Sequence, residues 1–339
     1  MCNLPTMSSK RVEFRHLIDQ IDWFCEHVLI PESFREFETV TVGNNGSILD
    51  PDTFPPSALF YLMARARALC PKLKRFSFIT RPEYVTESIL GCLMEEALTY
   101  VDRPASEGPS LDIEITVGVE AISPKATKPM KKGFGKKEVE ALGATLARWN
   151  ETARSPHKED HRFAKRVSPP EFSLRGYFLL KPYPLDDEEA VGDVVAGFDF
   201  LSALRRKSGV RTTLHLNPTY VAKGTEVAVA VARGEDYSPP SVDVIARSLL
   251  AIRDFPLQTG LSQASICLGL SDEGMAEEGK SFVPPAELQA EGSLWQALSA
   301  FNADTSDNKH DGFARIDAAM TAQRERRNDG KAYASVGGT

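Results

Sequence analysis

Short β-rich segments alternate with amphipathic segments along most of this chain, and this alternation is the feature that most limits its fold. Five segments are rich in β-branched and aromatic residues, at 37–43, 75–80, 112–120, 175–182 and 212–218. Apolar residues at helical spacing fill the stretches between them. Strands that alternate with helices predict a parallel sheet with right-handed crossovers. We therefore expect an α/β fold, an open or partly closed parallel barrel, to which residues 262–270 add a less clear strand.

Departures from this rhythm divide the chain. Residues 151–171 are rich in charge, histidine and proline, and they predict a surface insertion between a helix and the next strand. The alternation ends near residue 270, so we expect a barrel over 1–270 and a mixed or helical extension over 271–324. The polar end of the chain, 325–339, predicts a disordered tail.

Composition narrows the class of protein. Apolar residues make up 42% of the chain and charged residues 26%, as in ordinary folded proteins. The formal net charge of −7 gives no general attraction to nucleic acid or anionic lipid. No run is long and apolar enough for a membrane span, and five cysteines in a chain without a secretory leader favour a reducing compartment. These features predict a cytoplasmic protein with no membrane partner.

Polar residues follow the predicted strands at the ends where parallel α/β folds carry their functional loops. They are Asn44, Asn45, Gly46 and Ser47 after the first strand, then Arg81, Glu120, Lys181 and Asn217 after later ones. Together they would ring one opening, which suits a zwitterionic or multiply polar ligand. Each also has a plainer interpretation as a turn former, a helix cap or half of an ion pair. Glu120 is the hardest to explain in that way, because a carboxylate that closes an apolar strand is costly unless it is paired or liganded.

Other polar features carry weaker signals. Six lysines lie between residues 125 and 137, and they suit either a phosphate-binding patch or the solvated start of a helix. His157 and His161 have a spacing that suits a metal ion, but no third ligand is evident. The sequence contains no GxGxxG, P-loop, HExxH or GxSxG motif, so nicotinamide, P-loop, zincin and α/β-hydrolase functions lose their main support.

Five consecutive blocks resemble the core of the radical S-adenosylmethionine (SAM) superfamily. They read TVTVGNNGSILDP, FITRPEYVT, ITVGVEAISPKATKPMKKGF, YFLLKPYPLDDEEAVGD and LHLNPTYVAKGTEV, and the resemblance spans residues 1–260 in unbroken order. The type is that of the elongator catalytic subunit, MiaB and NifB, and the archaeosine-biosynthesis subgroup is the nearest. The resemblance implies a partial (βα)6 barrel that lacks its first strand, followed by a C-terminal extension.

The resemblance also implies two cofactors, a [4Fe–4S] cluster held by three cysteines of one loop and SAM bound at its open iron. The opening MCNLPTMSS resembles the end of that loop, with Cys2 as the third ligand and two ligands missing from this chain. A single thiolate does not fix such a cluster, and no other cysteine has the spacing to substitute. We therefore expect an N-terminally truncated sequence that binds an intact cluster poorly as written, in preference to a natural cluster-free protein.

Individual residues match positions of the resembled family. The segment Asn45, Gly46 and Ser47 matches the one that meets the SAM amino group, although the family's Gly-Gly-Glu is not reproduced. Glu120 matches a position near the ribose or the amino group. Arg81, with Lys181 as second choice, would engage the SAM carboxylate or a substrate anion, because a guanidinium binds a carboxylate bidentately. Asn217 would lie near the adenine or the substrate.

The reaction implied by the resemblance is reductive cleavage of SAM to a 5′-deoxyadenosyl radical, which abstracts hydrogen from a substrate. An electron donor such as flavodoxin or ferredoxin would be a partner, and a modified tRNA base is a candidate substrate. Two other interpretations stay open. One is a cluster-free α/β-barrel protein that binds SAM or another small polar ligand. The other is an ordinary barrel enzyme with Glu120 as general base and Lys181 as its electrostatic partner.

Overall fold

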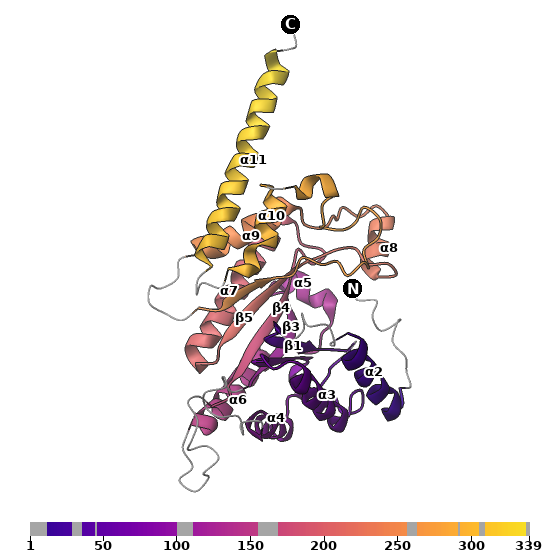
Figure 1. The fold of residues 1–339 in the computed structure, drawn as a ribbon. Coiled ribbons are helices and arrows are strands. Elements are labelled where there is room, and N and C mark those ends of the chain that lie inside the picture. Colours follow the sequence, from indigo (N-terminus) through magenta and orange to yellow (C-terminus); the bar gives the residue numbers. More distant parts are fainter. Residues whose placement is uncertain are drawn as a thin grey trace.

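Six parallel strands form one sheet, and their order in the sheet is their order in the sequence. The computed structural model describes residues 12–28, 36–44, 46–99, 111–154, 169–255, 263–290, 292–304 and 309–336. The strands are β1 Thr39–Val42, β2 Arg75–Thr80, β3 Asp112–Glu120, β4 Phe172–Leu180, β5 Thr212–Pro218 and β6 Ser265–Leu268. The predicted α/β class is thereby confirmed, as a half-barrel of six strands followed by C-terminal helices (Figure 1).

Helices connect successive strands. Those before β6 are α2 Phe14–His27, α3 Pro56–Leu69, η2 Pro82–Tyr84, α4 Glu87–Thr99, α5 Pro124–Met130, α6 Lys136–Arg154, α7 Asp187–Ser208, α8 Glu226–Ala232 and α9 Val242–Asp254. Local sequence signals set several of their starts. In α7, Asp186 accepts a hydrogen bond from the Glu189 N–H while the Glu189 side chain accepts one from the Asp186 N–H, and Gly209 ends the helix in the left-handed region.

The two faces of the sheet differ in chemistry. Side chains at alternate positions of the strands, such as Phe76, Phe178 and Leu214, face the helices and form the main core. Helix α7 lies so close to β4 that a side chain on Gly176 would contact Leu201. The intervening positions belong to the opposite face, which we call the inner face, and several of them are polar.

The C-terminal helices form a further layer. They are η4 Ala286–Gln289, α10 Leu294–Ser299, η5 Phe301–Ala303 and α11 His310–Val336. Helix α9 packs on α7, and both α10 and α11 pack on α9. Figure 1 shows α11 extending away from the sheet. The helix includes residues 325–336, which the sequence predicts to be disordered; alanine and arginine, both strong helix formers, recur along it.

The predicted insertion over 151–171 and the histidine pair within it fall mainly outside these elements. Helix α6 ends at Arg154 and β4 begins at Phe172, so the predicted insertion starts within the last turn of a helix. Residues 155–168, with His157 and His161, lie outside the described residues. Among the described helices, none has the length and apolar character needed to cross a membrane.

Candidate functional site

The loop after β1 is held by its own hydrogen bonds at the carboxyl edge of the sheet. The Asn44 side chain donates to the Ser47 carbonyl over 3.2 Å and accepts from the Gly46 N–H over 2.9 Å. The Ser47 hydroxyl is 2.5 Å from that of Thr80 at the end of β2, and the Ser47 side chain is buried. Gly46 is therefore the exposed part of this predicted segment, and Asn45 lies outside the described residues.

Arg81, Glu120, Lys132 and Phe134 form what we call the strand-end cluster, beyond β2 and β3. The Lys132 ammonium donates to Glu120 and to the Gly118 carbonyl. Arg81 donates to the Lys132 carbonyl over 2.7 Å and pairs with Glu83. Both cations lie against the Phe134 ring, with the Arg81 guanidinium carbon 5.2 Å and the Lys132 nitrogen 5.4 Å from its centroid. Two predicted residues, Arg81 and Glu120, thus share one partly open cluster.

Glu120 ends β3 and Lys181 directly follows β4, and both residues have an unusual backbone conformation. Their φ angles are 69° and 60°, in the left-handed region that side chains other than glycine seldom adopt. The pairing of β3 with β4 also shifts between Gly118 and Glu120. Such conformations cost free energy and persist where the surroundings fix them, often at functional sites.

Lys181 is more enclosed than the sequence suggests. Its side chain pairs with Asp187 at the start of α7 over 2.7 Å, and the residue is 7% exposed. Its carbonyl accepts hydrogen bonds from the Tyr237 and Thr219 hydroxyls, over 2.7 and 2.8 Å. Burial raises the pKa of Tyr237 to about 12, so this phenol stays protonated and able to donate. Lys181 therefore ties β4 to its neighbouring loops.

Asn217, at the end of β5, lies close to the loop after β6. A side chain on Gly269 would collide with the Asn217 amide oxygen and would approach His215 Nε2 to 3.1 Å. Beyond this point, Ala222 pairs with Ala276 in an antiparallel bridge, so the loops that follow β5 and β6 meet above the strand ends. Asn217 is accordingly part of the same edge as Glu120, on the far side of β4.

Sequence reasoning missed the polar residues of the inner face. They are Arg75, Glu114, Arg175, Tyr177 and His215, and they contact one another across β2, β3, β4 and β5. The sequence does hold a signal for them. Each of these residues alternates with apolar residues inside a predicted strand, which places it on the face opposite the core. Burial, together with the nearby Arg175 charge, lowers the pKa of His215 to about 4, so its imidazole is neutral at pH 7.

The lysine run is split by the structure. Lys132 pairs with Glu120, and Lys125 pairs with Glu189 over 2.6 Å. Lys136 lies 5.7 Å from the centre of the Phe200 ring. These contacts engage three of the six lysines, and the exposed Lys128, Lys131 and Lys137 are the more open members of the run.

The described cysteines do not fit a three-thiolate cluster. Cys25 and Cys70 are buried in the contact between α2 and α3, and burial raises the pKa of both thiols, which opposes the thiolate form. Cys92 is exposed on α4, whereas Cys267 lies in β6. No three potential metal-ligating side chains gather anywhere in the described part of the chain. Cys2 lies outside it.

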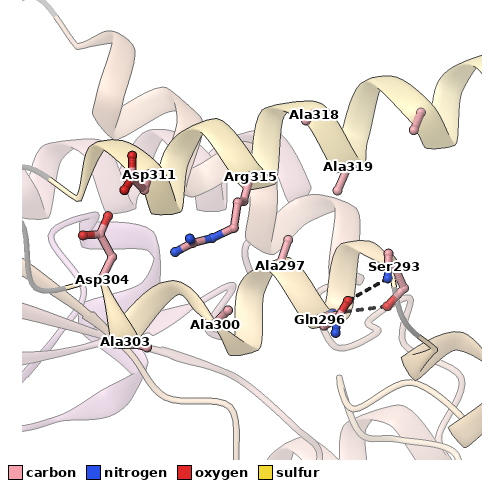
Figure 2. A pocket seen from close by; sticks show the side chains of 12 residues that line it. Ser293, Gln296, Ala297, Ala300, Ala303, Asp304, Asp311, Arg315, Ala318 and Ala319 are labelled. Atoms are coloured by element: carbon pink, nitrogen blue, oxygen red, sulfur yellow. Dashed lines mark hydrogen bonds between the residues drawn. The ribbon is translucent and has the colours of Figure 1, made fainter.

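A groove of about 840 Å3 lies between α10 and α11, away from the strand ends. Half of its lining residues are alanines: Ala297, Ala300, Ala303, Ala318, Ala319 and Ala322. Figure 2 shows Asp304 and Asp311 at one end and the Arg315 side chain between the two helices. Apart from these three charged residues its lining is small or neutral, and we assign the groove no function.

Comparison with known proteins gives little further. No protein-family model matches the chain, and no curated protein matches it. Among solved structures, an N-terminally deleted Elp3 of the archaeon Methanocaldococcus infernus is similar, with 11% identity and a TM-score of 0.44. The match covers 76% of this chain and 52% of that one, so this chain corresponds to about half of that protein. No inference about function follows from a likeness of this size.

Proposed function

We propose that this chain binds SAM at the carboxyl edge of its half-barrel, as a protein of the radical SAM type. The observation that carries the proposal is that the last residue of β3, Glu120, and the residue directly after β4, Lys181, are both charged and both held in the left-handed region. Strain of this kind at two neighbouring strand ends supports a binding role for the edge. A cytoplasmic location, which the cysteine usage predicts, belongs to the same proposal.

The strand-end cluster supplies groups that match those of SAM. The guanidinium of Arg81 and the ammonium of Lys132 suit the carboxylate of the methionine part, and Glu120 suits its amino group or the ribose hydroxyls. Phe134 lies beneath both cations and keeps them in place. Lys181 would contribute by fixing the backbone that follows β4, since its side chain is buried as well as paired with Asp187.

A [4Fe–4S] cluster would supply the electron that cleaves SAM to the 5′-deoxyadenosyl radical. The described cysteines of this chain do not fit that cluster, so its own residues are assigned to binding and orienting SAM. Hydrogen abstraction from a substrate, with a modified tRNA base as candidate, and an electron donor such as flavodoxin or ferredoxin are the further parts of the proposal.

One observation favours a second function. Because the four described thiols do not converge and the two that lie close together, Cys25 and Cys70, are buried, a cluster-free protein that binds SAM or another small polar ligand fits the described residues as well. Iron and sulfide content after anaerobic reconstitution separates the two. Iron retained by a chain extended at its N-terminus with the missing part of the cluster loop, and lost from it in Cys2→Ala, supports the radical SAM function, whereas SAM binding by iron-free protein supports the second.

The SAM site itself is tested by calorimetric titration of SAM into the chain and into Glu120→Gln. We expect about tenfold weaker binding by the variant, because an amide replaces the carboxylate that faces the ligand's amino or hydroxyl groups. Glu151→Gln, an exposed change on α6, is the matched control and is expected to bind as the unchanged chain does. Equal affinity in Glu120→Gln would remove this residue from the site.

A further inference from the structure

The inner face of the half-barrel carries a buried carboxylate between two guanidinium groups. Glu114 is 2% exposed, with Arg175 Nε 2.8 Å from one of its oxygens and Arg75 Nη1 3.9 Å from the other. The 2.8 Å contact is not aligned as a hydrogen bond, and Nε of each arginine lacks a hydrogen-bond partner. One negative charge thus faces two positive charges, which leaves this part of the inner face with an excess positive charge.

Arg175 also determines which ring nitrogen of His215 carries the proton. Its Nη1 atom lies 3.1 Å from His215 Nδ1. A guanidinium can only donate, so Nδ1 accepts and the imidazole proton is on Nε2. His215 therefore presents an N–H donor on its other side, towards the space beside Gly269 into which the Asn217 amide oxygen also extends.

A third donor lies beside His215. The Tyr177 ring packs edge-on against the His215 ring, with centroids 4.6 Å apart. Its hydroxyl forms no hydrogen bond with another described residue. On the same strand the Ser173 hydroxyl is buried without a partner, which is uncommon in folded proteins and calls for one.

This group of donors continues from the strand-end cluster. In the sheet, Tyr177 pairs with Gly118 on one side and with His215 on the other. Gly118 lies under the ion pair of Glu120 and Lys132, because a side chain there would collide with both. A ligand that reaches below the strand ends would therefore meet Tyr177, His215 and Arg175 next.

We propose that Arg175, Tyr177 and His215 form a subsite for an oxyanion group, a carboxylate or a phosphate, of a small ligand. Oxyanions accept hydrogen bonds from such donors, and the excess positive charge favours them over cations. Which molecule carries this oxyanion rests on the proposed function. If SAM binds at the strand-end cluster, the oxyanion belongs to the substrate.

Titration of the whole chain, labelled with 15N in its histidines, with inorganic phosphate and separately with acetate tests the subsite. We expect the His215 Nε2 resonance, assigned by its loss in His215→Phe, to shift on titration with at least one probe. Tyr177→Phe is expected to weaken that probe's binding about tenfold, or about 1.4 kcal/mol. The probe that binds more tightly identifies phosphate or carboxylate as the preferred group.

Arg81→Ala serves as the control, because it changes the strand-end cluster and leaves the three donors intact. Phosphate and acetate that fail to shift His215, or that bind Tyr177→Phe as tightly as the unchanged chain, would overturn the inference. So would anion binding lost in Arg81→Ala and kept in Tyr177→Phe. A failure of the SAM site appears elsewhere, as equal SAM affinity in Glu120→Gln with the His215 shift preserved.

Discussion

The pKa of His215, on the inner face, depends strongly on the fold. In the unfolded chain its pKa has the ordinary value of 6.5, whereas in the fold burial, together with Arg175, lowers it to about 4. Between these pH values the unfolded chain binds a proton that the folded chain does not. The free energy of unfolding therefore falls as the pH is lowered from 6.5 towards 4.

This linkage predicts a loss of about 2 kcal/mol of stability between pH 7 and pH 5 from His215 alone. Urea denaturation at a series of pH values measures it. His215→Gln is the control, since the amide has no proton to gain, and its stability should vary less over the same range. Parallel pH dependence in the two proteins would show that the imidazole is not held neutral by the fold.

At the scale of an element, helix α7 contains two glycines with opposite surroundings. An added side chain on Gly197 would come within 2.6 Å of the buried Phe178 ring in β4. The same addition on Gly192 would meet nothing within 4 Å. Helix α7 can thus lie close to the sheet because Gly197 has no side chain.

We predict opposite effects of alanine at these two positions. Gly197→Ala should lower the free energy of unfolding by about 1–3 kcal/mol through overpacking. Gly192→Ala should raise it by about 0.5–1 kcal/mol, because alanine favours the helix and touches nothing there. Chemical denaturation of both variants gives the comparison. A stabilised Gly197→Ala would mean that α7 lies farther from β4.

The order of these elements was predictable because each strand and helix has its own periodicity in the sequence. Strand β6 was less clear, since only four residues form it and it lies at an edge of the sheet. The helical end of α11 was not predicted, because its alanines and charged residues show helix propensity without a strong apolar stripe. Local sequence signals thus predict the elements that bury one apolar face. They predict short edge strands and helix ends without an apolar stripe poorly.

The candidate site was predictable only in part, for a reason at the scale of the whole molecule. Strand ends of a parallel sheet share one edge, so Arg81, Glu120 and Asn217 could be named from the chain alone. Their partners could not. Lys132 lies beside Glu120 because α5 ends at Lys131 in the left-handed region, and Lys181 pairs with Asp187 at the start of α7. The contact of Arg175 with Glu114 depends on the register of β3 with β4, which the sequence does not state.

Besides sharing the main core with the strands, the C-terminal helices reach the edge of the sheet through the side chain of Asn302 in η5. Asn302 accepts a hydrogen bond from the Leu268 N–H over 2.9 Å and donates one to the Leu268 carbonyl over 2.6 Å. Leu268 is the last residue of β6, whose other edge pairs with β5. Asn302 thus occupies backbone groups that an edge strand would otherwise leave open to other chains.

Asn302→Ala should therefore destabilise the whole molecule by about 1–3 kcal/mol, because both backbone groups of Leu268 lose a partner at a partly buried position. Gln289→Ala, which removes an exposed hydrogen bond to the Pro284 carbonyl, is the control and should cost no more than about 0.5 kcal/mol. Denaturation followed by circular dichroism and by tryptophan fluorescence measures both variants. If the residues after 270 folded as a separate domain, Asn302→Ala would unfold in two transitions and the sheet would keep its stability. A single transition shifted to lower denaturant is the result that one cooperative unit requires.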